Sequence, residues 1–130
     1  MTVLARIVGG AVTPACEAGV FARGEGIGAA VRFEGIVRRM EGEREIVALD
    51  YQTYDPMAER RLKELAGEIA ARHGLRGIAA IHGRGRVAVG EVSFVLWVAA
   101  AHRAEALAAV EEFIDRLKRD VPIWKIPVWK

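Results

Sequence analysis

Lysine is scarce in this sequence and gathers near its end. The chain has fifteen arginines but only four lysines, and three of the four (Lys118, Lys125 and Lys130) fall in the last thirteen positions. An ammonium group can lose its proton when burial or neighbouring charges depress its pKa, whereas a guanidinium effectively cannot. Lys118 and Lys125 are therefore candidates for proton transfer or nucleophilic chemistry. Spacing alone leaves the alternative open, because surface exposure is the usual state of charged residues.

A second group of donors stands at the expected start of a helix. His102 and Arg103 precede a run in which apolar residues recur at gaps of three and four. The free N–H groups and the positive dipole end at such a start favour an anion. The pair therefore predicts phosphate binding. His73, which closes an earlier helix, and His82, at the end of a strand, are favoured instead as structural histidines.

The helix between these two groups is expected over residues 103–120. Its predicted buried stripe consists of Leu107, Val110, Ile114, Leu117 and Val121. Its opposite face is predicted to be charged, with Glu105, Glu111, Glu112, Asp115, Arg116 and Arg119. Pro122 ends the helix, and residues 123–125 follow as a short extended segment.

The chain before this helix predicts strands and one further helix. Strands are expected at 2–8, 29–38, 46–54, 78–81, 86–89 and 91–100, with a kink at 83–85 between the fourth and fifth. The strands at 29–38 and 46–54 are expected to form a hairpin. A short helical turn is expected from Thr13 to about Ala22. The further helix is expected to begin with Asp55 as its N-cap and Pro56 at its first position, and to end at Gly74.

This order predicts an α+β fold in a single domain over residues 1–130, with two amphipathic helices covering a largely antiparallel sheet. The glycine-rich segment 24–28 comes before a strand rather than between a strand and a helix, so we interpret it as a loop and not as a nucleotide cradle.

Composition excludes several function classes. A net charge of +2 is too small to favour nucleic acid, and the longest apolar run, 94–101, falls well short of the ~20 residues that span a membrane. Arg6 interrupts the apolar N-terminal stretch, which argues against a secretion signal. The single cysteine, Cys16, cannot form an internal disulfide, so a cytoplasmic location is expected. No set of residues with metal-binding spacing is visible.

Five segments, in order, resemble one known family. They are 28–38 (GAAVRFEGIVR), 49–58 (LDYQTYDPMA), 81–91 (with Ile81-His82, Gly85 and Gly90-Glu91), 101–103 (AHR), and Lys118 with 121–125 (VPIWK). Together they resemble the large, catalytic subunit of molybdopterin synthase. The resemblance implies a hammerhead-like α+β fold and an enzyme of molybdenum cofactor synthesis.

The resemblance also implies a reaction and partners. A small ubiquitin-like subunit is expected to carry a C-terminal Gly-Gly thiocarboxylate, which supplies sulfur to cyclic pyranopterin monophosphate and forms the dithiolene of molybdopterin. Two large subunits are expected to form a homodimer within a heterotetramer. The step is expected to need no metal or other cofactor. The alternative is a scaffold of the same fold that docks a ubiquitin-like tail without catalysis.

Site residues follow from the same resemblance. Lys118 and Lys125 are expected to be catalytic, and the expected substrate-binding residues are Phe33, Arg38, His102 and Arg103. Three departures from the family are Gln52 and Pro127, both in place of glutamate, and an end at Lys130, which omits a tail that usually adds an arginine. Arg84 or Lys130 is the expected substitute for that arginine.

Helix length separates the two groups of cationic residues. Fifteen steps of about 1.5 Å lie between Arg103 and Lys118, so these positions are roughly 22 Å apart. One phosphorylated pterin would not comfortably bridge that distance. The sequence therefore predicts that His102 and Arg103 reach the substrate from the neighbouring large subunit.

Overall fold

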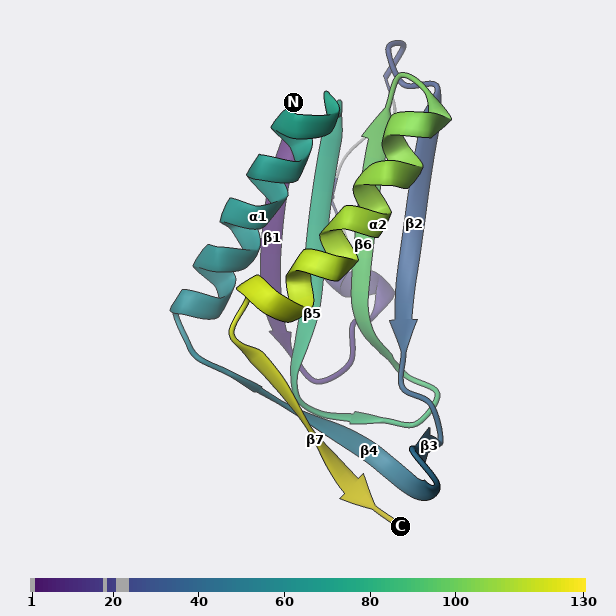
Figure 1. Ribbon diagram of the computed structural model, residues 1–130, viewed down its shortest axis with the longest axis vertical. Coiled ribbons are helices and arrows are strands. Elements are labelled where there is room, and N and C mark those ends of the chain that lie inside the picture. The colour runs from purple at the N-terminus through teal and green to yellow at the C-terminus, as the bar shows by residue number, and fades with distance from the viewer. Residues whose placement is uncertain (1, 18, 21–23) are drawn as a thin grey trace.

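Two long helices lie on the same face of a seven-stranded sheet (Figure 1). The computed structural model describes residues 2–17, 19–20 and 24–130. The strands are β1 (Thr2–Gly9), β2 (Ala29–Ile36), β3 (Met40–Glu41), β4 (Arg44–Thr53), β5 (Gly77–Ala88), β6 (Val92–Ala100) and β7 (Ile123–Trp129). The helices are α1 (Met57–His73) and α2 (Arg103–Asp120), and a 3-10 turn covers Pro14–Glu17. β1 runs parallel to β5, and the other described pairings are antiparallel. The α+β prediction is confirmed.

The long strand β5 joins two parts of the sheet. Its first half pairs with β6 on one side and β1 on the other, and the residues from Gly85 to Ala88 pair with β4. The prediction that residues 83–85 interrupt the strand is thus wrong, because β5 is one continuous strand that changes its pairing partner there. Glycine is needed at this point. A Cβ on Gly83 would lie 2.3 Å from the carbonyl oxygen of Gly10, and Gly85 has a φ of +83°.

The hairpin predicted between 29–38 and 46–54 is wrong. β2 pairs with β6 along its whole length, whereas β4 pairs with β5 and β7. Only the two residues of β3 turn back on β4, through Gly42 at a φ of +63°. The pairing of β2 and β4 was inferred from their proximity in the sequence, but their hydrogen bonds go to strands far along the chain.

The main core lies between the two helices and the part of the sheet formed by β1, β2, β5 and β6. The bounds predicted for α2 are confirmed, and so is most of its stripe: Val121 is buried, and Val110, Ile114 and Leu117 are partly buried against the core. Leu107, which is 56% exposed, is the exception, and Ala106, Ala109 and Phe113 are buried in addition. The buried face is therefore wider than predicted, and its first turn is centred on Ala106 rather than Leu107. The small side chains of Ala106 and Ala109 let the helix approach the sheet closely.

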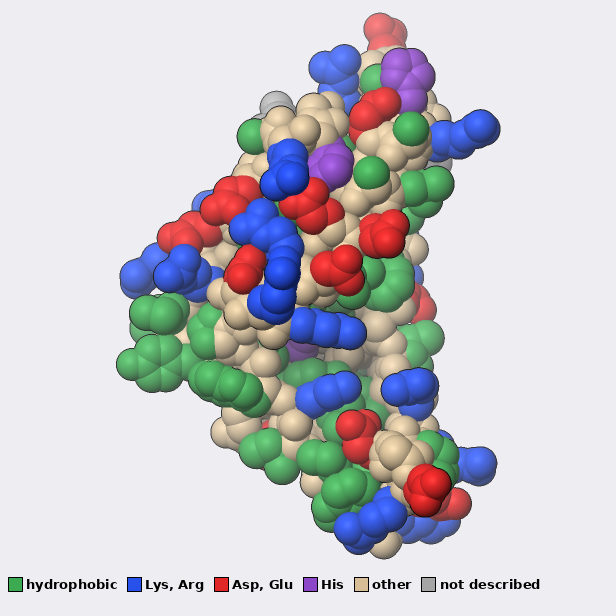
Figure 2. Space-filling model, viewed as in Figure 1, with side chains coloured by type: hydrophobic (Ala, Val, Ile, Leu, Met, Phe, Trp, Pro, Cys, Tyr) green, Lys and Arg blue, Asp and Glu red, His purple; other side chains and the backbone are tan. Residues whose placement is uncertain are grey.

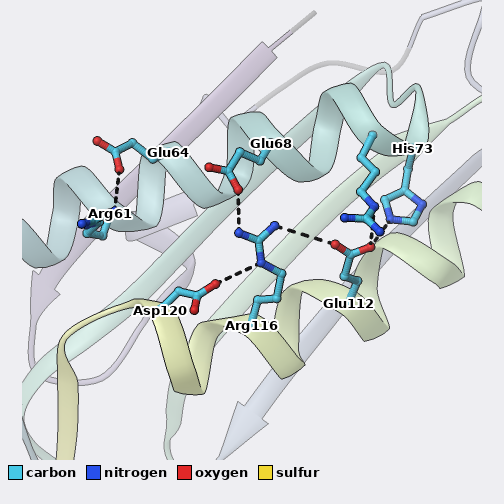
Figure 3. A network of polar contacts seen from close by, with 8 residues as sticks. Arg61, Glu64, Glu68, His73, Glu112, Arg116 and Asp120 are labelled. Carbon is cyan, nitrogen blue, oxygen red and sulfur yellow. Dashed lines mark hydrogen bonds and ion pairs between the residues drawn. The ribbon is translucent and has the colours of Figure 1, made fainter.

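Ion pairs join α1 to α2 (Figure 3). Arg116 donates to Glu68 of α1 at 2.6 Å and to Asp120 of its own helix at 3.0 Å. Glu112 lies 2.9 Å from Nε2 of His73. Glu112 and Arg116 were predicted on the charged face opposite the buried stripe, and part of that face is turned toward α1.

The start of α1 differs slightly from the sequence prediction. The N-cap is Pro56, which makes no side-chain capping hydrogen bond, and the helix begins at Met57. Asp55 instead accepts hydrogen bonds from Thr53 at 2.8 Å and Arg84 at 2.6 Å. Gly74 ends the helix in the left-handed conformation, as expected.

The helical turn expected from Thr13 is shorter than predicted, since the 3-10 turn ends at Glu17. Positions 18, 21 and 22 of that prediction lie outside the described residues. None of the helices found in the described part of the chain is long and apolar enough to cross a membrane.

Candidate functional site

A hollow of about 510 Å³ lies where the end of α2 meets β4 and β7. Residues from four elements, β4, β5, α2 and β7, line it: Tyr51, His82, Leu117, Lys118, Ile123, Trp124 and Lys125. Figure 2 shows lysine and arginine side chains beside hydrophobic ones on the face that carries the end of α2 and β7. The hollow therefore combines apolar walls with cationic groups.

The two candidate catalytic lysines both line this hollow. Lys118 lies in the last turn of α2, and Lys125 lies on β7 directly opposite Tyr51 of β4. Pro122 connects the two elements, and its carbonyl oxygen accepts the backbone N–H of Tyr54 at 3.2 Å. The turn after α2 is thus fixed to the end of β4, which directs β7 and its lysine back toward the helix.

Neither lysine is neutralised by a carboxylate in the described part of the chain. Lys118 and Lys125 are exposed, and no carboxylate of the described residues forms an ion pair with either. Lys130, by contrast, pairs with Glu45 at 3.1 Å. Two unpaired ammonium groups beside one hollow favour an anionic ligand, since each supplies three donors and a positive charge.

Two polar residues of the hollow, the buried His82 and the half-buried Tyr51, were not predicted as site residues. His82 is 5% exposed, and its Nδ1 lies 2.7 Å from the carbonyl oxygen of Gly83. Tyr51 presents its ring to His82 with centroids 4.9 Å apart, and its hydroxyl donates to Ser93 at 3.1 Å. Burial lowers the pKa of His82 and raises the pKa of Tyr51, so both side chains are kept neutral at pH 7.

The phosphate-binding pair lies at the other end of α2. His102 is the N-cap residue, and Glu105 completes a capping box with it, as its carboxylate accepts the backbone N–H of His102 at 3.2 Å. The His102 side chain is 80% exposed, and Arg103 is also exposed. Because both Arg103 and Lys118 lie on one continuous helix, the separation of about 22 Å holds in the folded chain.

The remaining predicted site residues are not brought to the hollow within one chain. Phe33 packs in the main core with its ring 6.3 Å from that of Phe94. Arg38 is exposed just beyond the end of β2. Arg84 pairs with Asp55 at 2.6 Å, and Lys130 with Glu45, so both expected substitutes for the tail arginine already have carboxylate partners.

The hollow suits an anionic ligand that also has apolar parts. Leu117, Ile123 and Trp124 offer apolar contact, and the two lysines offer donors. A mostly apolar cleft with a few convergent polar groups is the usual form of a ligand site. Gln52, one of the family departures, lies opposite Trp124 in the sheet register and donates to Asp50 at 3.0 Å.

Comparisons with known proteins agree with the fold and with the sequence resemblance. The family model described as "MoaE protein" matches residues 13–120. A molybdopterin synthase catalytic subunit from Oryza sativa subsp. indica is 42% identical over 102 residues, which are 78% of this chain and 53% of that protein. This chain thus spans about half the length of that curated relative.

Solved structures give the same result. The crystal structure of molybdopterin synthase from Staphylococcus aureus has a TM-score of 0.83 and 30% identity, over 95% of this chain and 90% of that one. A MoaE protein of molybdopterin biosynthesis from Burkholderia ambifaria has a TM-score of 0.80 and 28% identity, over 99% and 90%. With a family model that covers most of its length and relatives of this similarity, the chain belongs to the MoaE family, that of the molybdopterin synthase catalytic subunits.

Proposed function

We propose that this chain is the catalytic subunit of a molybdopterin synthase and transfers sulfur from a protein thiocarboxylate to cyclic pyranopterin monophosphate. The observation that carries the proposal is the hollow itself, where Lys118 and Lys125 converge from two elements without carboxylate partners among the described residues. Membership of the MoaE family supports the reaction. The sulfur donor is the Gly-Gly tail of a small ubiquitin-like subunit.

The residues of the hollow meet the demands of this chemistry. A diglycine tail has no side chains, so it can pass between Leu117, Ile123 and Trp124 as extended backbone. The ammonium groups of Lys118 and Lys125 bind its terminal anion and the oxygen on which charge develops during attack. A lysine can also return a proton to the substrate, which an arginine would hold too tightly.

The substrate phosphate needs donors that one hollow does not supply. His102 and Arg103 offer them at the start of α2, but about 22 Å from Lys118. The proposed assembly therefore pairs two large subunits, so that His102 and Arg103 of one serve the lysines of the other. One small subunit at each end completes a heterotetramer.

Reconstitution tests the function directly. The purified chain is mixed with a thiocarboxylated ubiquitin-like partner and cyclic pyranopterin monophosphate, and molybdopterin is measured by fluorescence after oxidation. Product is expected only when all three components are present. If the partner binds and is competent with another synthase, yet no product forms, the chain is a scaffold rather than an enzyme.

A further inference from the structure

His82 has one ring nitrogen available to a ligand. A carbonyl oxygen only accepts hydrogen bonds, so the contact of Nδ1 with Gly83 places the ring proton on Nδ1. The lone pair of the neutral ring is then on Nε2. No side-chain nitrogen or oxygen of the described residues is both sealed from solvent and without a hydrogen-bond partner. Nε2, which has no hydrogen-bond partner among the residues that the structure describes, therefore opens onto the hollow that His82 lines.

The surroundings of the ring keep that lone pair free of a proton. Phe94 of β6 and Ile7 of β1 are its apolar neighbours in the sheet. The titratable and charged groups that share the hollow are Tyr51 of β4, Lys118 of α2 and Lys125 of β7. None of these is a carboxylate that would stabilise an imidazolium, and burial lowers the pKa of His82 further.

The proposed reaction requires such an acceptor. Once the thiocarboxylate sulfur has bonded to the pterin carbon, the sulfur is still attached to the acyl carbon of the partner's last glycine. Release needs water: its oxygen bonds to the acyl carbon, the acyl–sulfur bond breaks, and the sulfur leaves with the electron pair on the pterin. The partner ends as a carboxylic acid. A proton must leave the attacking water, and a protonated lysine has no lone pair to take it.

We propose that His82 is the general base of this hydrolysis, with Nε2 accepting the proton of the water that cleaves the acyl–sulfur bond. The ring of Tyr51 packs against the imidazole in a T-shaped contact, and the Gly83 carbonyl fixes the tautomer. In this assignment the lysines bind the anionic groups, and His82 takes the proton of the attacking water in the same hollow. The inference rests on the proposed function, since it concerns a step of that reaction.

The decisive variant is His82→Asn. The asparagine amide can replace Nδ1 as donor to the Gly83 carbonyl, but it has no atom at the place of Nε2. His73→Gln is the matched control, because His73 lies on α1 against Glu112 and away from the hollow. Chemical unfolding and partner binding are measured for both. If His82→Asn does not fold, His82→Gln, which keeps a neutral amide near the place of Nε2, takes its role.

The readouts are product formation and the mass of the partner in a single turnover. His82→Asn is expected to slow release roughly a hundredfold or more. A covalent partner–pterin thioester should then accumulate, which intact-mass measurement detects. Because burial lowers the pKa of His82, the decline of the wild-type rate should be centred at a pH below the usual histidine pKa of about 6.5, and the variant should lack that decline.

Each other outcome rejects a distinct claim. A folded His82→Asn protein with the wild-type rate and pH profile would overturn the role of His82. Slow product formation without accumulation of the thioester would mean that His82 acts in a step before hydrolysis. That result would also overturn its role as the general base. Absence of product from the wild-type complex would reject the proposed function, and the role of His82 with it.

Discussion

At the scale of single residues, the chemistry of the two lysines can be separated from their charge. Lys118 and Lys125 are exposed and pack into no core cluster, so replacing them should leave folding intact. Lys118→Ala and Lys125→Ala are expected to lose most product formation, by a factor of roughly 100 or more if each moves a proton. The measurement is molybdopterin formed per minute at saturating partner.

Arginine replacements sharpen this test. Lys125→Arg and Lys118→Arg keep the positive charge, but the guanidinium stays protonated. We expect both to remain nearly as inactive as the alanine variants. Near wild-type turnover in both would end the assignment of proton transfer and leave the lysines as anion-binding groups. Lys130→Ala is the control, since Lys130 pairs with Glu45 outside the hollow.

Glycine substitutions test the fold at the same scale. In Gly83→Ala the new Cβ would lie 2.3 Å from a backbone oxygen, a contact that requires β1 and β5 to move apart. We expect a loss of about 1–3 kcal/mol in the free energy of unfolding. Gly67→Ala, in the middle of α1 with open space around it, is expected to gain about 0.5–1 kcal/mol. Urea unfolding of both proteins measures the difference, and equal effects would contradict it.

At the scale of elements, the contact between α1 and α2 has a predictable pH dependence. A hydrogen bond from His73, helped by Arg72 and Arg116, lowers the pKa of Glu112. A carboxylate with a lowered folded-state pKa contributes stability above its unfolded pKa, about 4.5, and loses it as pH falls through the folded value. Glu112→Gln should therefore destabilise the protein at pH 7 by about 0.5–1 kcal/mol, because these groups are partly exposed.

The same variant should make little difference in strong acid, where Glu112 is protonated in both states. Unfolding free energies measured from pH 7 down to pH 3 should thus converge for the wild type and Glu112→Gln. Glu111→Gln is a suitable control, as Glu111 is exposed one residue away. A constant difference across the pH range would mean that packing, not charge, explains the effect.

Local signals in the sequence predicted the elements better than their partners. The bounds of α2 follow from helical periodicity and Pro122, and Gly74 marks the end of α1. Strand pairing was harder, because the partners of β4 are β5 and β7, which lie far along the chain. Pattern alone also did not show that Leu107 is exposed while Ala106 and Ala109 are buried, since both sets recur at helical spacing.

The candidate site was predictable in part for the same reason. Only the end of α2 and the turn at Pro122 separate Lys118 from Lys125, so the two lysines could be expected to lie near each other. Tyr51 and His82 reach the hollow only through pairings that involve β4 and β5. The one sequence signal for His82 was its place in a glycine-rich strand end, which equally fits a structural role.

At the scale of the whole molecule, the length of α2 predicts a site shared between two copies of the chain. Arg103→Ala and Lys125→Ala proteins should each be inactive alone. After subunit exchange, a mixed dimer has one site with both defects and one with neither. Activity is expected to recover toward half of the wild-type value per mixed dimer. Exchange verified by mass without any recovery would contradict the shared site.

The change of partners along β5 also divides the molecule into regions that can open separately. The residues from Gly77 to His82 are held by strands on both sides, whereas those from Gly85 to Ala88 are joined to β4, whose other edge carries β7. Amide hydrogens of β4 and β7 should therefore exchange with solvent faster than those of β5 from Gly77 to His82, because local opening can expose them without unfolding the core.

Such an opening would carry Tyr51 and Lys125 away from His82 and Lys118, so the hollow exists only while the two regions are closed together. A ligand bound there must stabilise the closed form by mass action. Saturation with the partner's diglycine tail should slow amide exchange in β4 and β7 more than in β6. A bound ligand would then hold the two parts of the sheet together, so that ligand binding and local stability at the site would be coupled.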